Sequence, residues 1–110
     1  GVAISGDAMQ LTRLLTNLLD NAFKYVPKGG EVMLRVAAGP RIEVRDNGPG
    51  VPEELRERIF DRFQRGRAEI AGVGLGLALA RAIAERHGLV ISCRDAAPGA
   101  AFVLEPETEK

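Results

Sequence analysis

A carboxylate, an amide and two glycines stand together at residues 46–50, where an apolar strand is expected to end. The stretch reads Asp46-Asn47-Gly48-Pro49-Gly50. Because side chains alternate between the two faces of a strand, Asp46 is expected to share the buried face of Ile42 and Val44. A buried carboxylate without a partner is costly, and glycines let another molecule approach the backbone closely. The stretch therefore indicates a ligand that donates a hydrogen bond to Asp46, and a turn capped by the same carboxylate is the alternative.

A stripe of polar side chains borders the apolar face of a predicted helix upstream of this stretch. Apolar residues recur at steps of three and four from Leu11 to Val26, as in an amphipathic helix. Asp7 is expected to cap the start of this helix, and Pro27 with the glycines after it is expected to end it. At about 100° per residue, one stripe roughly 60° wide holds Asn17, Asn21 and Lys24. Three polar groups are therefore expected to point toward one place.

Two β-hairpins are predicted from alternating apolar residues and turn signals. Their strands are expected over residues 31–38, 41–46, 89–94 and 100–105, with turns at Gly39-Pro40 and Ala97-Pro98-Gly99. Gly1–Gly6 is expected to form a short edge strand, and Pro106–Lys110 a frayed tail. Val51-Pro52-Glu53-Glu54 suits the first turn of a helix that leads to Phe60.

A glycine-rich run precedes the last predicted helix, which covers Ala78–His87. The run is Gly72-Val73-Gly74-Leu75-Gly76-Leu77. Backbone N–H groups and the positive end of a helix dipole favour an anion such as phosphate. The run lacks the Gly-Lys-Ser/Thr of a P-loop and the spacing of a dinucleotide fingerprint, so by itself it does not specify a nucleotide fold. The polar residues before it, Gln64–Ala71, are expected to form a mobile loop.

The composition excludes several other classes of protein. The chain has 110 residues, with 15 basic and 15 acidic side chains, so no overall field favours nucleic acid or an anionic membrane. One cysteine excludes an internal disulfide, and one histidine leaves a zinc cluster unsupported. No apolar run approaches the roughly 20 residues that span a bilayer. We therefore expect a single soluble domain, residues 1–110, cut from a larger protein.

Four motifs follow one another along nearly the whole chain. They are NLLDNAFKY (residues 17–25), DNGPG (46–50), IFDRF (59–63) and GVGLGLAL (72–79). In this order they resemble the asparagine box, first glycine box, phenylalanine box and second glycine box of the ATP-binding domain of bacterial sensor histidine kinases. The wider superfamily includes DNA gyrase, heat-shock chaperones and mismatch-repair ATPases. The resemblance implies an α+β fold of the Bergerat type, a two-layer α/β sandwich whose mixed, mostly antiparallel sheet is covered on one face by about three helices.

The resemblance also implies a site for ATP and Mg²⁺. Asp46 would accept a hydrogen bond from the adenine amino group, and Gly48 and Gly50 would leave room for the base. Asn21, with Asn17, would hold Mg²⁺, since amide oxygens suit a hard cation. The remaining ATP contacts that it implies are Lys24, Tyr25, Arg65, Arg67, Gly72, Val73, Gly74, Leu75, Gly76 and Leu77. Arg65 or Arg67 would close over the nucleotide as part of a lid.

Two positions bear on the reaction. Hydrolysing members of the superfamily have a glutamate where this chain has Asn17, an amide without useful basicity, so we expect little hydrolysis. Val73 stands where the family often has Ser or Thr, which puts the lid contacts in question. Phe60 and Phe63 are expected to pack in the core, and His87, at a helix C-terminus, is expected to be structural with its charge favoured by the helix dipole.

The implied function is histidine phosphorylation in two-component signal transduction. The acceptor histidine would lie on a separate upstream dimerisation domain, and a response regulator would receive the phosphate afterwards. The domain is expected to be cytoplasmic, without contact to nucleic acid or membrane, in a parent protein anchored in the inner membrane. The alternatives are a serine-protein kinase or ATPase of the same superfamily, or a non-catalytic module that senses nucleotide.

Overall fold

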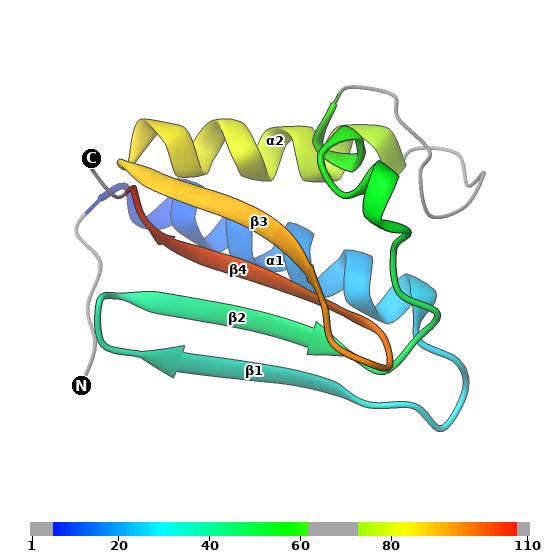
Figure 1. The fold of residues 1–110 in the computed structure, drawn as a ribbon. Helices are drawn as coiled ribbons and strands as arrows, with labels where there is room; N and C mark the ends of the chain where they lie inside the picture. Colours follow the sequence, from blue (N-terminus) through cyan, green and yellow to red (C-terminus); the bar gives the residue numbers. More distant parts are fainter. Residues whose placement is uncertain (1–5, 62–72, 108–110) are drawn as a thin grey trace.

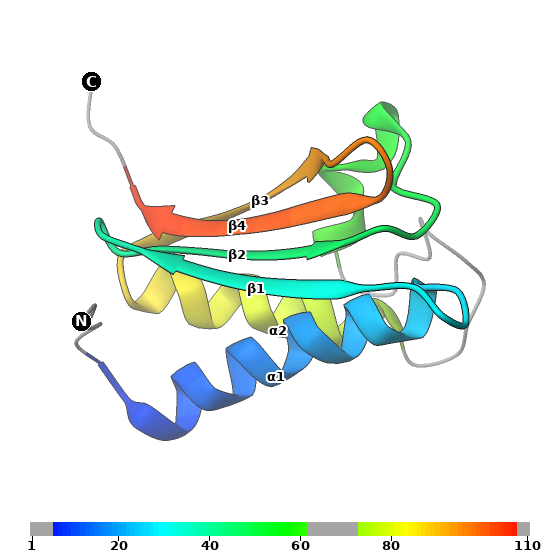
Figure 2. The same cartoon turned by 90° about the horizontal axis from the view of Figure 1, so that it is seen from below.

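The computed structural model describes residues 6–61 and 73–107. In chain order the elements are α1 (Ala8–Tyr25), β1 (Val32–Ala37), β2 (Arg41–Asp46), the 3-10 turns η1 (Glu53–Leu55) and η2 (Arg58–Phe60), α2 (Val73–Arg86), β3 (Leu89–Asp95) and β4 (Ala100–Pro106). The four strands pair in the order β1-β2-β4-β3, and each pairing among them is antiparallel. Figures 1 and 2 show α1 and α2 side by side on one face of this sheet. The predicted α+β class is therefore confirmed.

The helix α1 begins and ends where the local sequence predicts. The Asp7 carboxylate accepts a hydrogen bond from the Gln10 N–H at 3.1 Å, which satisfies one of the N–H groups that lack a partner inside the helix. Val26 is extended and precedes Pro27, so the helix stops at Tyr25. The face toward the sheet is fully buried at Leu14, Leu18 and Ala22.

The core lies between the helices and the strands β2, β4 and β3. Phe102 on β4 is fully buried, and its ring meets that of Phe60 edge to face, with centroids 6.1 Å apart. Such edge-to-face pairs add about 0.5–1.5 kcal/mol beyond the area they bury. The predicted packing role of Phe60 is confirmed. Phe63 lies outside the described residues.

The open face of the sheet holds one buried carboxylate. Glu43 on β2 is 6% exposed, although its neighbour Val44 fills the opposite, helix-covered face. Arg45 contacts the Glu43 Oε2 atom at 2.9 Å and Arg41 contacts Oε1 at 3.5 Å. The long arginine side chains therefore shield this carboxylate and compensate its charge.

Three local predictions differ from the structure. The helix expected from Val51 is instead two short 3-10 turns, closed by bonds such as Asp61 N–H to Arg58 C=O at 2.9 Å. The glycine run was expected to be a loop, but α2 begins at Val73 and includes Gly76, because core packing of the apolar face that begins at Leu77 outweighs the low helix propensity of glycine. Within the expected tail, Pro106 belongs to β4.

Other expectations cannot be compared with the structure. The loop predicted at Gln64–Ala71 lies outside the described residues, as does all of the expected edge strand except Gly6. In the part of the chain that the structure describes, neither α1 nor α2 combines the length and hydropathy needed to cross a membrane.

Candidate functional site

Three elements bring their candidate residues to one end of the fold. In Figure 1 the last turns of α1, the end of β2 and the start of α2 all lie on the right. The helices run in opposite directions, so the C-terminal half of α1 lies beside the N-terminal half of α2. Asn21, Asp46 and Gly76 are therefore at the same end of the molecule, although they are far apart in sequence.

The Asp46 carboxylate is buried at this end. Its side chain is 1% exposed, as the alternation along β2 predicts. The Oδ1 atom accepts hydrogen bonds from the Gly48 N–H at 2.9 Å and from the Ala100 N–H at 3.4 Å. The bond from the Gly48 N–H is the contact of a turn cap. The alternative prediction, a turn capped by Asp46, therefore describes part of the geometry correctly. The bond from the Ala100 N–H comes from β4 and holds the carboxylate across the sheet.

Gly99, which the sequence places in the turn before β4, packs directly against the backbone of Asp46. Gly99 has φ +93°, and a Cβ added there would overlap the Asp46 carbonyl oxygen. The Gly99 carbonyl oxygen in turn lies 3.1 Å from where a Cβ of Gly50 would stand, and Gly50 has φ +79°. The turn between β3 and β4 therefore packs against the turn that follows β2. The Pro-Gly dipeptide signals the turn but not this contact.

The two asparagines of α1 have different surroundings. The Asn17 Nδ2 atom donates a hydrogen bond to the Gly76 carbonyl oxygen at 3.2 Å, which ties α1 to α2. Asn21, one turn later, is 6% exposed, and neither its Oδ1 nor its Nδ2 atom has a hydrogen-bond partner within the described structure. An unsatisfied buried amide costs about 1–3 kcal/mol, so Asn21 is suited to a partner that the protein itself does not supply.

Gly76 has free space beside it within the described structure. A Cβ added there would meet no atom of the described residues within 4 Å, and its φ is not positive. Glycine inside a helix is less stable than alanine by roughly 0.5–1 kcal/mol, and the described surroundings give no packing reason for that cost. The free space beside Gly76 is consistent with the approach of a ligand to the backbone.

The other predicted site residues are placed as follows. Gly48 is buried, Lys24 is exposed, and the Leu77 side chain is 3% exposed in the core, so Leu77 can line a site only through its backbone. The backbone of four further residues is described without their side-chain surroundings: Tyr25, Val73, Gly74 and Leu75. Three lie outside the described residues: Arg65, Arg67 and Gly72.

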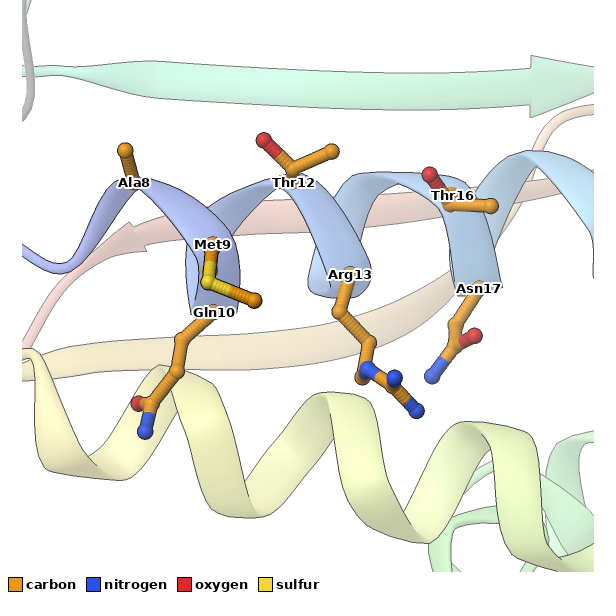
Figure 3. A pocket seen from close by; sticks show the side chains of 7 residues that line it. All are labelled: Ala8, Met9, Gln10, Thr12, Arg13, Thr16 and Asn17. Carbon is orange, nitrogen blue, oxygen red and sulfur yellow. The ribbon is translucent and has the colours of Figure 1, made fainter.

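A groove of about 650 Å³ runs along the first half of α1. Figure 3 shows Gln10, Arg13 and Asn17 pointing toward α2, while Thr12 and Thr16 point to the opposite side. Among the predicted site residues that the structure describes, Asn17 alone lines this groove, and Asp46 does not line it. The groove is therefore separate from the buried carboxylate.

Replacing Gly76 by alanine should change stability and ligand binding in opposite directions. We expect the free energy of unfolding to rise by roughly 0.5–1 kcal/mol, because alanine favours the helix. ATP affinity should fall roughly tenfold, because the methyl group fills space that a bound phosphate would need. Urea denaturation and calorimetric titration measure the two effects. Thr16→Ala is the control, since it should stabilise α1 similarly without affecting affinity; equal affinity in both variants would contradict a ligand beside Gly76.

The architecture and these contacts define a two-layer α/β domain in which the end of α1, the end of β2 and the start of α2 lie at one end of the fold. Residues 6–110, nearly the whole chain, match the model of the histidine kinase-, DNA gyrase B- and HSP90-like ATPases. The chain therefore belongs to this ATPase family.

The relatives are longer proteins named for sensing or signal transduction. The swarming motility regulation sensor protein RssA of Serratia marcescens is 39% identical over 121 residues, covering 98% of this chain and 26% of RssA. The histidine-protein kinase/phosphatase MprB of a Mycobacterium species is 41% identical over 105 residues, covering 90% of this chain and 20% of MprB. The chain thus spans about a quarter or less of these relatives.

Solved structures of histidine kinases share the fold. A mycobacterial sensor histidine kinase MprB superposes with a TM-score of 0.80 at 33% identity, over 96% of this chain and 80% of that one. The catalytic domain of histidine kinase ThkA gives a TM-score of 0.82 at 30% identity, over 94% of this chain and 70% of that one.

Proposed function

We propose that this chain is the catalytic domain of a sensor histidine kinase, which binds ATP with Mg²⁺ and supplies the γ-phosphate to a histidine on a separate domain. Family membership and the names of the relatives support the ATPase and kinase parts of this proposal. The observation that carries the metal and nucleotide part is the buried amide of Asn21, which has no partner in the described structure.

The donor set at Asn21 fits a hard cation. Mg²⁺ prefers oxygen ligands and is usually held by few protein groups together with phosphates and water. Asn21 would offer its Oδ1 atom. Asn17 would offer the same atom, because its Nδ2 is the atom that donates to Gly76. A bound Mg²⁺ would neutralise charge on the phosphates.

The adenine base and the phosphates of ATP would lie on either side of Asn17 and Asn21. Asp46 would accept a hydrogen bond from the adenine amino group, since its carboxylate is buried at the end of β2. The space beside Gly76 would take a phosphate near the start of α2, where the helix dipole favours negative charge. Lys24, exposed on α1, is within the same end of the fold and would reach a phosphate.

A kinase is favoured over an efficient ATPase by the chemistry of Asn17. Its amide is not basic enough to activate water, and its Nδ2 atom is engaged by Gly76. The γ-phosphate would therefore be retained for a protein acceptor. The single histidine of the chain, His87, is held by backbone groups at the opposite end of the fold, so the acceptor would be on another domain.

The proposed partners are other parts of the signalling system. The relatives are four to five times longer than the matched region, which supports an upstream dimerisation domain carrying the acceptor histidine in the same polypeptide. A response regulator would then receive the phosphate. The domain would work in the cytoplasm of a cell whose inner membrane anchors the parent protein.

Phosphate transfer tests the proposal directly. The chain, mixed with the separately produced upstream domain and Mg-ATP labelled at the γ-phosphate, should label a histidine of that domain, and the chain alone should label nothing. Phosphate release faster than transfer would indicate an ATPase instead. Binding of ATP without any transfer would indicate a nucleotide-sensing module.

Alanine at Asn21 and at Asn17 should have different effects on stability. Asn21→Ala removes an unsatisfied buried amide and should raise the free energy of unfolding by about 1 kcal/mol without ligand. Asn17→Ala removes the bond to Gly76, so its stability should be lower than that of Asn21→Ala by about 1–2 kcal/mol. Because both sites lie on α1, the helix-propensity gain cancels in this comparison.

The same pair of variants tests the metal. In Asn21→Ala, the increase in ATP affinity that Mg²⁺ produces should be lost, as measured by titration with and without the ion. A Mg²⁺ effect that survives in Asn21→Ala would contradict the assignment of Asn21 as a ligand. Unchanged stability in Asn21→Ala would show that its amide is satisfied in solution.

A further inference from the structure

Three parts of the chain meet at the end of the fold opposite to the candidate site. In Figure 1 the end of α2 and the start of α1 lie together on the left. His87 and Gly88 follow α2, and Gly88 has the positive φ of +72° that commonly ends a helix. The Glu107 N–H, just after β4, donates to the Gly88 carbonyl oxygen at 3.1 Å. His87 and Gly88 therefore lie beside both the first and the last of the described residues.

Both ring nitrogens of His87 have backbone partners. The Nδ1 atom lies 2.8 Å from the Ile83 carbonyl oxygen, and the Asp7 N–H donates to Nε2 at 3.1 Å. A carbonyl oxygen only accepts and an amide N–H only donates. Only the neutral ring with its proton on Nδ1 satisfies both partners. The expectation of a charged His87 at the helix end therefore does not describe this geometry.

The ring also packs against the segment that leads into α1. A Cβ added at Gly6 would overlap the His87 Cδ2 atom, so Gly6 lies directly against the ring. The next residue, Asp7, is the one whose side chain caps α1. The His87 ring therefore accepts a hydrogen bond from the backbone of Asp7 and also packs against Gly6, the two residues that precede α1.

We propose that His87 is a proton-sensitive latch that fastens the start of α1 to the end of α2. Histidine is the side chain that ordinarily changes its charge between about pH 5 and 8. Protonation of Nε2 would turn the acceptor of the Asp7 N–H into a second donor, so the link is present when the ring is neutral and is lost on acidification.

The charged residues on the segments that meet at His87 are Asp7 before α1, Glu85 and Arg86 on α2, and Glu107 after β4. All four are exposed, so solvent and salt screen the charges of these side chains.

Release of the latch would affect the candidate site through the two helices. α1 carries Asn17, and α2 carries its partner Gly76 at the other end of the molecule. The latch and the Asn17–Gly76 hydrogen bond thus connect two helices that also pack against one another in the core. Loss of the latch would leave the hydrogen bond and this packing in place, and it would release the segment entering α1. The consequence for ATP rests on the proposed function.

Hydrogen exchange of the Asp7 amide tests the latch without any nucleotide. In the wild-type chain, the protection factor of this amide, corrected for intrinsic exchange, should fall roughly two- to tenfold between pH 8 and pH 5.5. The ¹⁵N spectrum of the ring should show a proton on Nδ1 at pH 8. An Nε2–H ring at pH 8, or Asp7 protection that is constant while the ring titrates, would overturn the proposal.

Two variants separate the latch from ordinary destabilisation. His87→Gln offers an oxygen near the position of Nε2 that does not titrate, so Asp7 protection should be retained and independent of pH. His87→Ala should show low protection at both pH values. A His87→Gln chain with the same pH-dependent loss as wild type would contradict the latch.

Nucleotide binding provides the link to function. Mg-ATP affinity in the wild-type chain should fall by about two- to fivefold from pH 8 to pH 5.5, within the fold-change expected for one neutral hydrogen bond, and should be nearly constant in His87→Gln. A chain that shows the latch but does not bind Mg-ATP would support the latch and contradict the proposed function, because the Asp7 measurement needs no ligand.

Discussion

Replacing Asp46 by asparagine is expected to weaken ATP binding roughly ten- to a hundredfold, since a charge-assisted hydrogen bond contributes about 1.5–3 kcal/mol. The amide oxygen can still accept the Gly48 and Ala100 N–H groups that now bond Oδ1. The amide nitrogen, in contrast, would bring a donor toward the adenine amino group, which is also a donor. Binding should therefore suffer more than folding. Calorimetric titration with Mg-ATP and thermal melting measure the two effects.

Asp95→Asn is the matched control for this experiment. Asp95 accepts the N–H of Ala97, two residues later, at 3.2 Å, in the same local arrangement that Asp46 makes with Gly48, but it is exposed. The control should bind ATP like wild type and melt at nearly the same temperature. If Asp46→Asn kept full ATP affinity while its melting temperature fell, Asp46 would be a turn cap alone and the adenine assignment would be wrong.

Replacing Gly99 by alanine should be the most destabilising change that we predict. A non-glycine residue at φ +93° is strained by about 1–3 kcal/mol. The new Cβ would also overlap the Asp46 carbonyl oxygen, and forcing backbone apart adds a comparable cost. We expect the free energy of unfolding to fall by on the order of 4 kcal/mol. A shift of that size lowers the melting temperature of a domain this small by more than about 15 °C.

Gly29→Ala isolates the overlap from the backbone strain. Gly29 has a similar φ of +84°, but a Cβ there would meet nothing within 4 Å. It should lose only about 1–2 kcal/mol, the cost of the left-handed conformation. Equal losses in the two variants would show that the Asp46 segment moves aside freely. A Gly99→Ala chain that still folds should bind ATP more weakly, because the carboxylate of Asp46 would be displaced with its backbone.

Much of the local structure could be predicted because its causes lie within a few residues. Asp7 caps α1 by accepting from Gln10, three residues later. The burial of Asp46 follows from the alternation of β2, which repeats every second residue. Where two signals overlap, local reading was less accurate. Proline and acids suggest one helix after Val51, but bonds between residues three apart close two short turns there.

The residues of the candidate site were suggested by motif and spacing, but their surroundings were not. Helical spacing alone places Asn17 and Asn21 alike, since both face the border of the apolar arc of one helix. The antiparallel packing of α1 against α2 gives Asn17 a partner 59 residues away and leaves the amide of Asn21 buried without one in the described structure. Their assignment to Mg²⁺ remains a prediction.

The sequence by itself determined the four strands, their two hairpins, the helix α1 and most of α2, because periodicity, caps and turns act over a few residues. Which of these units touch one another was decided by the tertiary structure. The strand order β1-β2-β4-β3 places β4 beside β2, so Ala100 bonds Asp46 across 54 residues and Gly99 must lack a side chain. The packing of the helices likewise joins Asp7 to His87 across 80 residues. Such contacts depend on how whole faces pair, and an apolar stripe does not specify the element that will cover it.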